Sequence, residues 1–306
     1  MQPIRGILLK VISVCVFMVM ASLIKASSEH VPPGQAVFFR SFFAIPVIVV
    51  WLLWRHELKT GLRTAHPVNH FFRGMVGVTA MGLGFAGLGL LPLPEVTAIG
   101  YASPLLVVIF AAMFLNEKVG IFRLSTVALG MIGVLIVLSP RLEVGTTAPD
   151  VRETLGAVVV LGGAMFGALA AVFVRKMVQT ETTSAIVFWF SVTASVLSLL
   201  TLPWGWVMPS PQEAMMLIGA GVFGGLGQIL MTTSYRYADA SLIAPFDYTS
   251  MLLALGVGFF IFGEVPTLTM LVGGTIILVA GVIVILRERQ LGIERGKGRK
   301  VTPTQG

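Results

Sequence analysis

Long apolar runs separated by short polar segments dominate the chain. Ten runs approach the roughly 20 mainly apolar residues that a helix needs to cross a bilayer, and they are too long and continuous for the alternating strands of a membrane barrel. They cover 7–26, 34–54, 71–91, 95–115, 121–139, 154–174, 183–203, 213–234, 240–262 and 267–287. The pattern predicts an all-α polytopic membrane protein of ten transmembrane helices, with short connections that make sequential helices antiparallel.

Basic residues set the expected orientation, because Lys and Arg concentrate in cytoplasmic loops. Seventeen of the 21 Lys and Arg residues fall on the N-terminal side of the membrane, three fall on the other side, and Arg40 lies within a span. We therefore expect both termini in the cytoplasm. The hydrophilic segment 140–153 is expected outside, and it separates two groups of five spans, 1–139 and 154–287; a basic cytoplasmic tail, 288–306, follows them.

The composition supports a lipid environment. Only 11% of residues are charged and 56% are hydrophobic, with mean hydropathy +0.92, whereas soluble domains carry roughly 25% charged residues. The net charge of +7 comes from the ends of apolar runs and the tail, so we expect no nucleic-acid partner. One cysteine, Cys15, excludes an intrachain disulfide and a cysteine-based metal site. His66 and His70 have helical metal spacing, but Pro67 stands between them, so we expect solvated loop histidines, no metal and no cofactor.

The two halves repeat a frame. "YASPLLVVIFAAMFLNE" (101–117) and "YTSMLLALGVGFFIFGE" (248–264) are offset by 147 residues, as are Gly74/Gly77 and Gly221/Gly224. Upstream, an offset of 150 aligns Lys25 with Arg175 and Ser41 with Ser191. Because each half has five spans, an odd number, duplicated halves insert in opposite directions. Such five-plus-five inverted repeats are a common plan of secondary transporters.

The chain resembles the drug/metabolite transporter superfamily, specifically ten-span proteins with two EamA-type domains. The resemblance rests on "LIKASSEHVPPGQAVFFRSFFA", the Gly-rich third span, "YASPLLVVIFAAMFLNEKV" and "APFDYTSMLLALGVGFFIFGEVP". It implies transport of a small organic metabolite across the inner membrane of a bacterium. It also implies a cavity lined by spans 4 and 9 and completed by spans 1, 3, 6 and 8. The last segment is similar to that of bacterial riboflavin transporters.

Prolines mark where a substrate site is expected. Pro104 in span 4 and Pro245 in span 9 each remove a helical hydrogen bond and release a carbonyl four residues back. Tyr101, Ser103, Tyr248 and Ser250 accompany these breaks, which predicts a midplane pocket. The competing interpretation is a pair of packing kinks whose Tyr and Ser hydroxyls bond to neighbouring helices. At the far end of each frame, Glu117 and Glu264 are expected to be interfacial anchors.

Three further polar residues are candidates inside the membrane. Asp247 is expected about seven residues into span 9, where a desolvated carboxyl is costly, so we predict a proton-coupling role or, alternatively, a hydroxyl partner. Arg40 is predicted either to bind an anionic substrate group or to snorkel to the interface. Gln228 suits a polar ligand or an interhelical hydrogen bond.

The leading functional hypothesis is a secondary transporter working by alternating access, with riboflavin uptake as the narrow version and export of an amino acid, drug or other metabolite as the alternative. A membrane-embedded enzyme is the rival of another class, but the sequence has no His-Glu-x-x-His, no Gly-x-Ser-x-Gly and no intramembrane Asp pair. A channel is disfavoured because no polar ring is evident. Expected partners are the lipid bilayer and a small-molecule substrate. Whether the chain forms a homodimer, in which direction it transports and what ion couples transport stay open.

Overall fold

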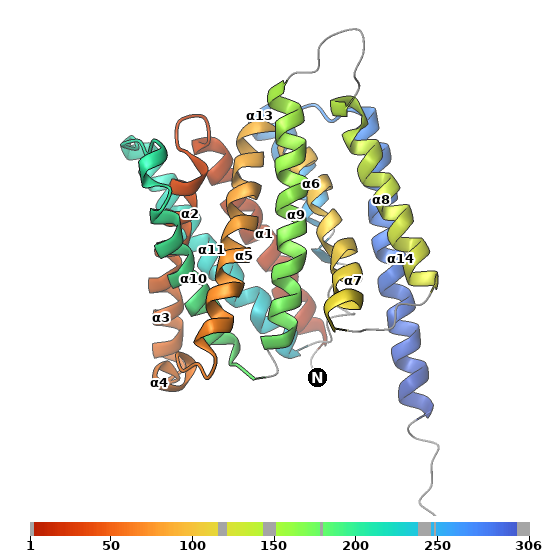
Figure 1. Cartoon of the computed structure of the whole chain (residues 1–306), viewed down its shortest axis with the longest axis horizontal. Helices are drawn as coiled ribbons and strands as arrows, with labels where there is room; N and C mark the ends of the chain where they lie inside the picture. Colours follow the sequence, from red (N-terminus) through yellow and green to blue (C-terminus); the bar gives the residue numbers. More distant parts are fainter. Residues whose placement is uncertain are drawn as a thin grey trace, which may run out of the picture.

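The structure is a computed structural model that describes residues 3–115, 121–142, 151–177, 180–237, 246–247 and 249–298. Within these ranges the chain is helical and contains no strand. The helices pack side by side into a bundle (Figure 1). Tyr248, Pro245, Glu117 and most of the 140–153 segment lie outside the described residues, as does the end of the tail.

In the ranges that the structure describes, ten helical segments correspond in order to the predicted spans. Spans 2 and 4 are each two helices, a short helix α4 (Leu58–Gly61) follows span 2, and a 3-10 turn η1 (Leu202–Trp204) follows span 7. The segments are α1 (Pro3–Ser27), α2 (Pro33–Phe42) with α3 (Ala44–Trp54), α5 (Pro67–Leu90), α6 (Leu93–Gly100) with α7 (Ala102–Leu115), α8 (Ile121–Leu142), α9 (Val151–Met177), α10 (Thr183–Leu199), α11 (Pro211–Tyr237), α13 (Thr249–Phe262) and α14 (Leu268–Gly298).

The two internal breaks have the same cause. Proline lacks an N–H and collides with the carbonyl four residues back. Pro104 acts on Gly100, where α6 ends before Tyr101, which confirms the expected break in span 4. Pro46 acts on Phe42, where α2 ends before Phe43. The break in span 2 was not expected from the sequence.

One predicted boundary was wrong, and one expected break lies partly outside the described residues. A break was expected near Pro245 in span 9: Asp247 lies in a short 3-10 turn and α13 begins at Thr249, while 238–245 lie outside the described residues. Span 10 was expected to end at 287, but α14 continues to Gly298 and includes part of the basic tail. Charged residues such as Arg and Lys are good helix formers, so losing the apolar pattern does not end a helix.

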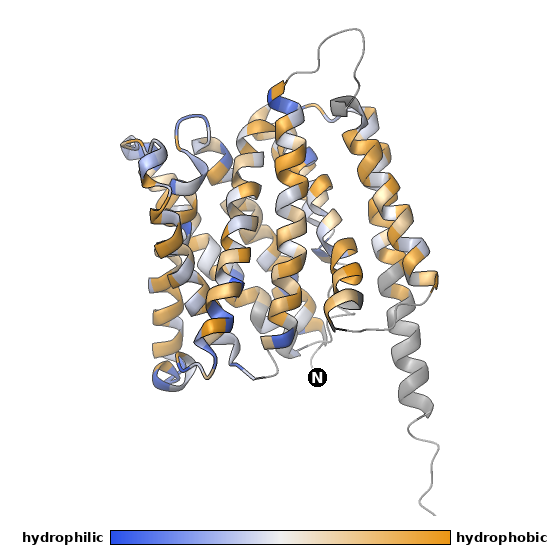
Figure 2. Ribbon diagram, viewed as in Figure 1, coloured by the Kyte–Doolittle hydropathy of each residue, from blue (hydrophilic) through white to orange (hydrophobic). Residues whose placement is uncertain are grey.

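The outer surface of the bundle is apolar, as lipid contact requires. Among the residues that the structure describes, six helical spans are long and apolar enough to cross a membrane, and four shorter apolar helices accompany them. Large hydrophobic side chains point outward, among them Phe260, which is 84% exposed, and apolar residues colour much of each helix (Figure 2). The structure therefore confirms the predicted all-α polytopic membrane fold.

Helix contacts obey the exchange expected of an inverted duplication. In an inverted duplication, α1 corresponds to α9 and α5 corresponds to α11. The contact between α1 and α11 should therefore have a counterpart between α9 and α5, and both contacts are extensive. The pairs α2 with α10 and α8 with α14 map onto themselves, and they also pack together. Each half therefore builds its core against the other half rather than alone.

The same exchange is visible at single residues. A Cβ added at Gly77 of α5 would lie 2.8 Å from the Phe190 ring of α10. The equivalent glycine, Gly224 of α11, would meet Arg40 of α2 at 3.0 Å. Phe190 is 150 residues after Arg40, which is the offset that aligns the second spans of the two halves. Both glycines allow a close helix approach at matching points.

The direction of the chain is also inverted between the halves. In Figure 1, α1 starts at the side marked N, whereas α9 starts at the opposite side. Helix α14 ends on the same side as the N-terminus (Figure 1). A chain with an even number of spans ends on the side of the membrane on which it begins.

Candidate functional site

Spans 4 and 9 meet at hydroxyl groups that the sequence singled out. Tyr101, buried at the break between α6 and α7, points its hydroxyl at the hydroxyl of Ser250 in the first turn of α13. The Ser250 hydroxyl donates to the Asp247 carbonyl at 2.7 Å, and the Tyr101 hydroxyl lies 3.3 Å from that carbonyl. Three of the predicted residues therefore converge on one contact between the halves.

The Asp247 carboxylate is neutralised by a residue that sequence reasoning counted only as a topology charge. Lys10 Nζ of α1 lies 2.7 Å from Asp247 Oδ1. The Lys10 side chain is 2% exposed, whereas that of Asp247 is 48% exposed. The carboxylate is thus paired and partly exposed, as its cost inside an apolar span requires, and the deeply buried member of the pair is the ammonium.

A second ion pair joins the opposite ends of the same two spans. Lys25 Nζ, near the end of α1, lies 2.8 Å from Glu264 Oε1, just after α13, and donates to the carbonyls of Leu88 and Leu91 at 3.2 and 2.9 Å. Glu264 Oε2 accepts the amide N–H of Leu93 at 2.9 Å. Glu264 therefore ties three spans together, which is more than the interfacial anchor that the sequence suggested.

Arg40 lies in a separate polar cluster. It is 5% exposed, so it does not snorkel to the surface as one interpretation held. Its guanidinium is 5.9 Å from the centroid of the Phe190 ring, and the guanidinium of Arg73 of α5 is 3.7 Å from the same centroid. Arg73 was missed as a site residue, because the predicted span 71–91 placed it at a membrane face.

The other candidates are not drawn into one pocket with Tyr101. The Ser103 hydroxyl faces Gly167 of α9, 3.4 Å from a Cβ added there. Gln228 of α11 is partly buried and forms no hydrogen bond within the part of the chain that the structure describes. Tyr248, the counterpart of Tyr101, falls outside those ranges. The hydroxyl contact, the ion pairs and the arginine cluster are thus distinct features.

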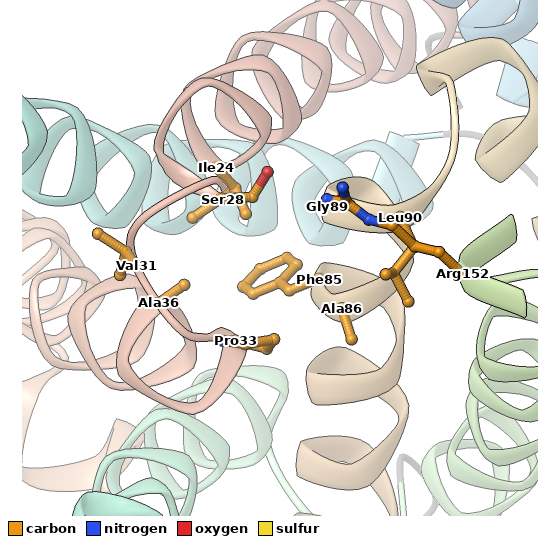
Figure 3. Close-up of a pocket in the computed structure, with 10 residues that line it drawn as sticks. All are labelled: Ile24, Ser28, Val31, Pro33, Ala36, Phe85, Ala86, Gly89, Leu90 and Arg152. Atoms are coloured by element: carbon orange, nitrogen blue, oxygen red, sulfur yellow. The ribbon is translucent and has the colours of Figure 1, made fainter. Parts of the chain in front are cut away.

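A cavity of about 200 Å³ lies between the end of α1, the start of α2, the end of α5 and the start of α9 (Figure 3). Phe85 of α5 projects into it, while Ser28 after α1 and Arg152 of α9 stand at its rim (Figure 3). Its lining is mostly apolar, and its volume is below the roughly 300 Å³ at which small-molecule pockets begin. The cavity contains none of the candidate site residues that the sequence singled out.

His70 contradicts the expectation of solvated loop histidines. It lies in α5, is buried, and places Nε2 3.7 Å from Glu181 Oε2. Among the described residues no group of three or more His, Cys, Asp or Glu could hold a metal ion. Glu181 instead accepts hydrogen bonds from Thr64 Oγ1 and the amides of Ala65 and His66, at 2.8 to 3.0 Å. The carboxylate thereby links the α4–α5 connection to the segment before α10.

The structure is an inverted helical bundle that carries polar groups between its two halves. This arrangement is typical of a multi-pass membrane transporter, and comparison with known proteins agrees with that class. The model of the EamA-like transporter family matches residues 4–139 and again 154–287. The chain belongs to the EamA-like transporter family and carries two EamA domains of the drug/metabolite transporter superfamily.

Characterised relatives carry different substrates. The chain is 29% identical over 278 residues to the pseudopaline exporter of Pseudomonas aeruginosa, covering 90% of this chain and 94% of the exporter. It is 28% identical to the riboflavin transporter of Vibrio cholerae, with 91% and 92% coverage. It is 27% identical to the S-adenosylmethionine uptake transporter of Rickettsia felis, with 84% coverage of both chains. The role common to them is membrane transport, which disfavours the enzyme hypothesis.

A solved protein crystal structure has the same fold. The two structures superpose with a TM-score of 0.65 at 19% sequence identity, covering 94% of this chain and 98% of the other. At that identity the likeness concerns the arrangement of helices alone.

Proposed function

We propose that the protein is a secondary transporter that moves a small organic metabolite by alternating access between its two halves. The observation that carries the proposal is the contact of Tyr101 with Ser250 and the Asp247 carbonyl, where the broken span 4 meets the start of span 9. Hydroxyl and carbonyl groups at breaks in helices can bind a polar ligand. When no ligand is present, they can form hydrogen bonds with each other. Substrate would replace this contact.

We assign the two ion pairs to the two gates. Lys10 and Lys25 are 15 residues apart on α1, a separation of about 22 Å at the helical rise. Lys10 pairs with Asp247, just before α13, and Lys25 pairs with Glu264, just after it. Opening one side requires breaking one pair while the other holds, so the bundle opens to one face at a time.

Asp247 is our candidate coupling group, now as half of an ion pair. Protonating its carboxyl removes the negative charge that holds Lys10, which would favour opening on the side of the termini. We propose that this side is cytoplasmic, in agreement with the excess of basic residues there, and that the membrane is a bacterial inner membrane, as the bacterial relatives suggest.

Riboflavin uptake remains the narrow hypothesis, supported by the relative from Vibrio cholerae. Export of an amino acid or another metabolite is the alternative, supported by the exporter from Pseudomonas aeruginosa at similar identity and coverage. The substrates and directions of these relatives differ, so only an assay decides between them.

The test is uptake into proteoliposomes. The full chain is reconstituted, and labelled riboflavin, amino acids and other metabolites are offered with and without a pH gradient. We expect at least one compound to accumulate faster than in empty liposomes. Tyr101→Ala is expected to reduce its transport strongly, and Asp247→Asn to abolish the effect of the gradient.

Lys59→Gln provides the matched control, because Lys59 is exposed on the short helix α4 and takes part in none of these contacts. If the Tyr101→Ala variant transports like the parent, the assignment of the hydroxyl contact to the substrate path is wrong. If transport responds to the gradient equally in the parent and in Asp247→Asn, another group couples transport.

A further inference from the structure

Two arginines approach the same aromatic ring in the interior of the bundle. Arg40 comes from α2, Arg73 from α5, and Phe190 stands at the eighth of the 17 positions of α10. Their guanidinium carbons lie 5.9 and 3.7 Å from the ring centroid. Three spans from both halves thus place two positive charges at one point, near the middle of span 7.

Neither charge is compensated within the part of the chain that the structure describes. Arg40 Nε and both Nε and Nη1 of Arg73 are buried without a hydrogen-bond partner. No carboxylate forms an ion pair with either guanidinium in the described ranges. Stacking on one phenyl face recovers part of the lost hydration, but buried donors without acceptors and like charges side by side are unfavourable.

The backbone around the cluster is built to admit the guanidinium groups. A Cβ at Gly77 would lie 3.2 Å from Arg73 Nη1, and a Cβ at Gly224 would lie 3.0 Å from Arg40 Nε. The two glycines occupy equivalent positions in the two halves. Both repeats therefore leave room for the arginines at equivalent glycines.

We propose that Arg40 and Arg73 form a binding site for the anionic group of the transported substrate, a carboxylate or a phosphate, with Phe190 as its floor. A guanidinium presents planar pairs of N–H donors that match the oxygens of these groups. An anion between the two arginines satisfies the buried donors and removes their mutual repulsion. The proposal rests on the proposed function, because it assigns the substrate class of that transporter.

Burial of the cluster sets a second requirement on the ligand. Because Arg40 is almost fully buried, the anion reaches the cluster when the bundle opens and is enclosed when it closes. Binding of the anion would thus accompany the change of state that carries the substrate across.

The test uses matched probes on the purified full chain. Thermal unfolding is followed in detergent with benzoate or benzamide, lactate or lactamide, and phenyl phosphate or phenol. For at least one pair we expect the acid to bind about tenfold or more tightly than its uncharged partner, since hydrogen bonds to charged groups supply 1.5–3 kcal/mol. Arg40→Gln and Arg73→Gln are expected to remove that preference, while Lys59→Gln retains it. A preference confined to the phosphate pair would identify a phosphate site, and one confined to the carboxylate pairs a carboxylate site.

Stability without ligand separates binding from a structural role. We expect Arg73→Gln, which relieves the charge repulsion, to unfold at a temperature equal to or above that of the parent, as is common when a functional site is neutralised. The proposal is overturned if acids and their uncharged partners bind alike, or if the preference survives in the Arg40→Gln/Arg73→Gln double variant. Uptake of the same probes into liposomes distinguishes the two proposals: acid binding without transport refutes the transporter, and transport without acid preference refutes the anion site.

Discussion

Glu181 shows how a carboxylate outside the membrane spans is controlled by its neighbours. Burial alone would raise the pKa of this carboxyl, but hydrogen bonds from Thr64 and from the amides of His66 and Ala65 outweigh it and hold the pKa below its ordinary value of 4.5. A carboxyl whose pKa is lowered by folding stabilises the protein above the unfolded pKa, and this stability is lost as the pH falls through the folded value.

We therefore expect Glu181→Gln to lower the thermal unfolding midpoint at pH 7, and this effect to shrink as the pH falls below 4.5 through the lowered pKa of the folded state. Thermal scans of parent and variant at pH 7, 5 and 3.5 measure the difference. Glu57→Gln is the control, because Glu57 is paired only with the partly exposed Arg55, and surface pairs contribute little. An equal penalty at pH 7 and pH 3.5 would contradict the assignment.

The Tyr101 hydroxyl permits a finer substitution than removal of the ring. Tyr101→Phe keeps the buried ring, while Ser250 still bonds to the Asp247 carbonyl. We expect a stability loss of about 0.5–1.5 kcal/mol, the net value of one hydrogen bond, and a clear loss of transport. Chemical unfolding and liposome uptake measure the two effects. Ser125→Ala, which removes an exposed bond within α8, should leave transport unchanged.

Sequence reasoning identified most of these residues but not their partners. Tyr101, Ser250, Asp247 and Arg40 stood out because a polar group inside an apolar run demands an explanation. Lys10 and Arg73 did not, because they are close enough to a run's end to serve as topology signals. A sequence gives the depth of a residue along its own helix; which face it occupies, and what stands opposite, depends on tertiary packing.

At the level of helices, close packing between α8 and α14 depends on glycine. A Cβ added at Gly273 would lie 2.6 Å from the Gly133 carbonyl, and one added at Gly133 would lie 2.8 Å from the Gly273 carbonyl. Backbone atoms cannot rotate away as a side chain would, so the two helices must separate to admit a methyl group. These two helices are the fifth span of each half, so the exchange of the halves maps the pair onto itself.

Gly273→Ala is expected to destabilise the protein by about 1–3 kcal/mol, the usual cost of overpacking. Gly82→Ala is the matched control, because nothing lies within 4 Å of a Cβ there, and removing a helical glycine favours the helix by up to about 1 kcal/mol. Thermal unfolding in the same detergent compares the variants. Destabilisation by Gly82→Ala as large as that by Gly273→Ala would show that the contact is not the cause.

The helices themselves were largely predictable, since lipid leaves the backbone few alternatives to a helix and apolar length fixes the spans. The break at Tyr101 also followed from Pro104. The break at Phe43 was missed although Pro46 carries the same signal, because span 2 otherwise reads as continuous. Pro245 predicted a break in span 9, and among the described residues a 3-10 turn at Asp247 precedes α13, which begins at Thr249.

For the molecule as a whole, alternating access requires that the two ion pairs oppose each other. If Lys25–Glu264 holds one side closed and Lys10–Asp247 the other, weakening one pair shifts the population toward opening on its own side. Glu264→Gln and Asp247→Asn should then change the exposure of any single position in opposite directions. If the substitutions merely loosened the bundle, both would change the exposure of that position in the same direction.

Ser28 is a suitable reporter, since it lines the cavity beside the Lys25–Glu264 pair (Figure 3). In a Cys15→Ala background, Ser28→Cys is labelled in nanodiscs with a membrane-impermeant maleimide. We expect Glu264→Gln to raise the labelling rate about fivefold or more, within the usual range of coupling energies, and Asp247→Asn to leave it unchanged or lower it. Glu213→Gln is the control, because it breaks the nearby pair with His30 without touching α13. Faster labelling in Asp247→Asn, or an equal increase in Glu213→Gln, would mean that the ion pairs do not gate opposite faces.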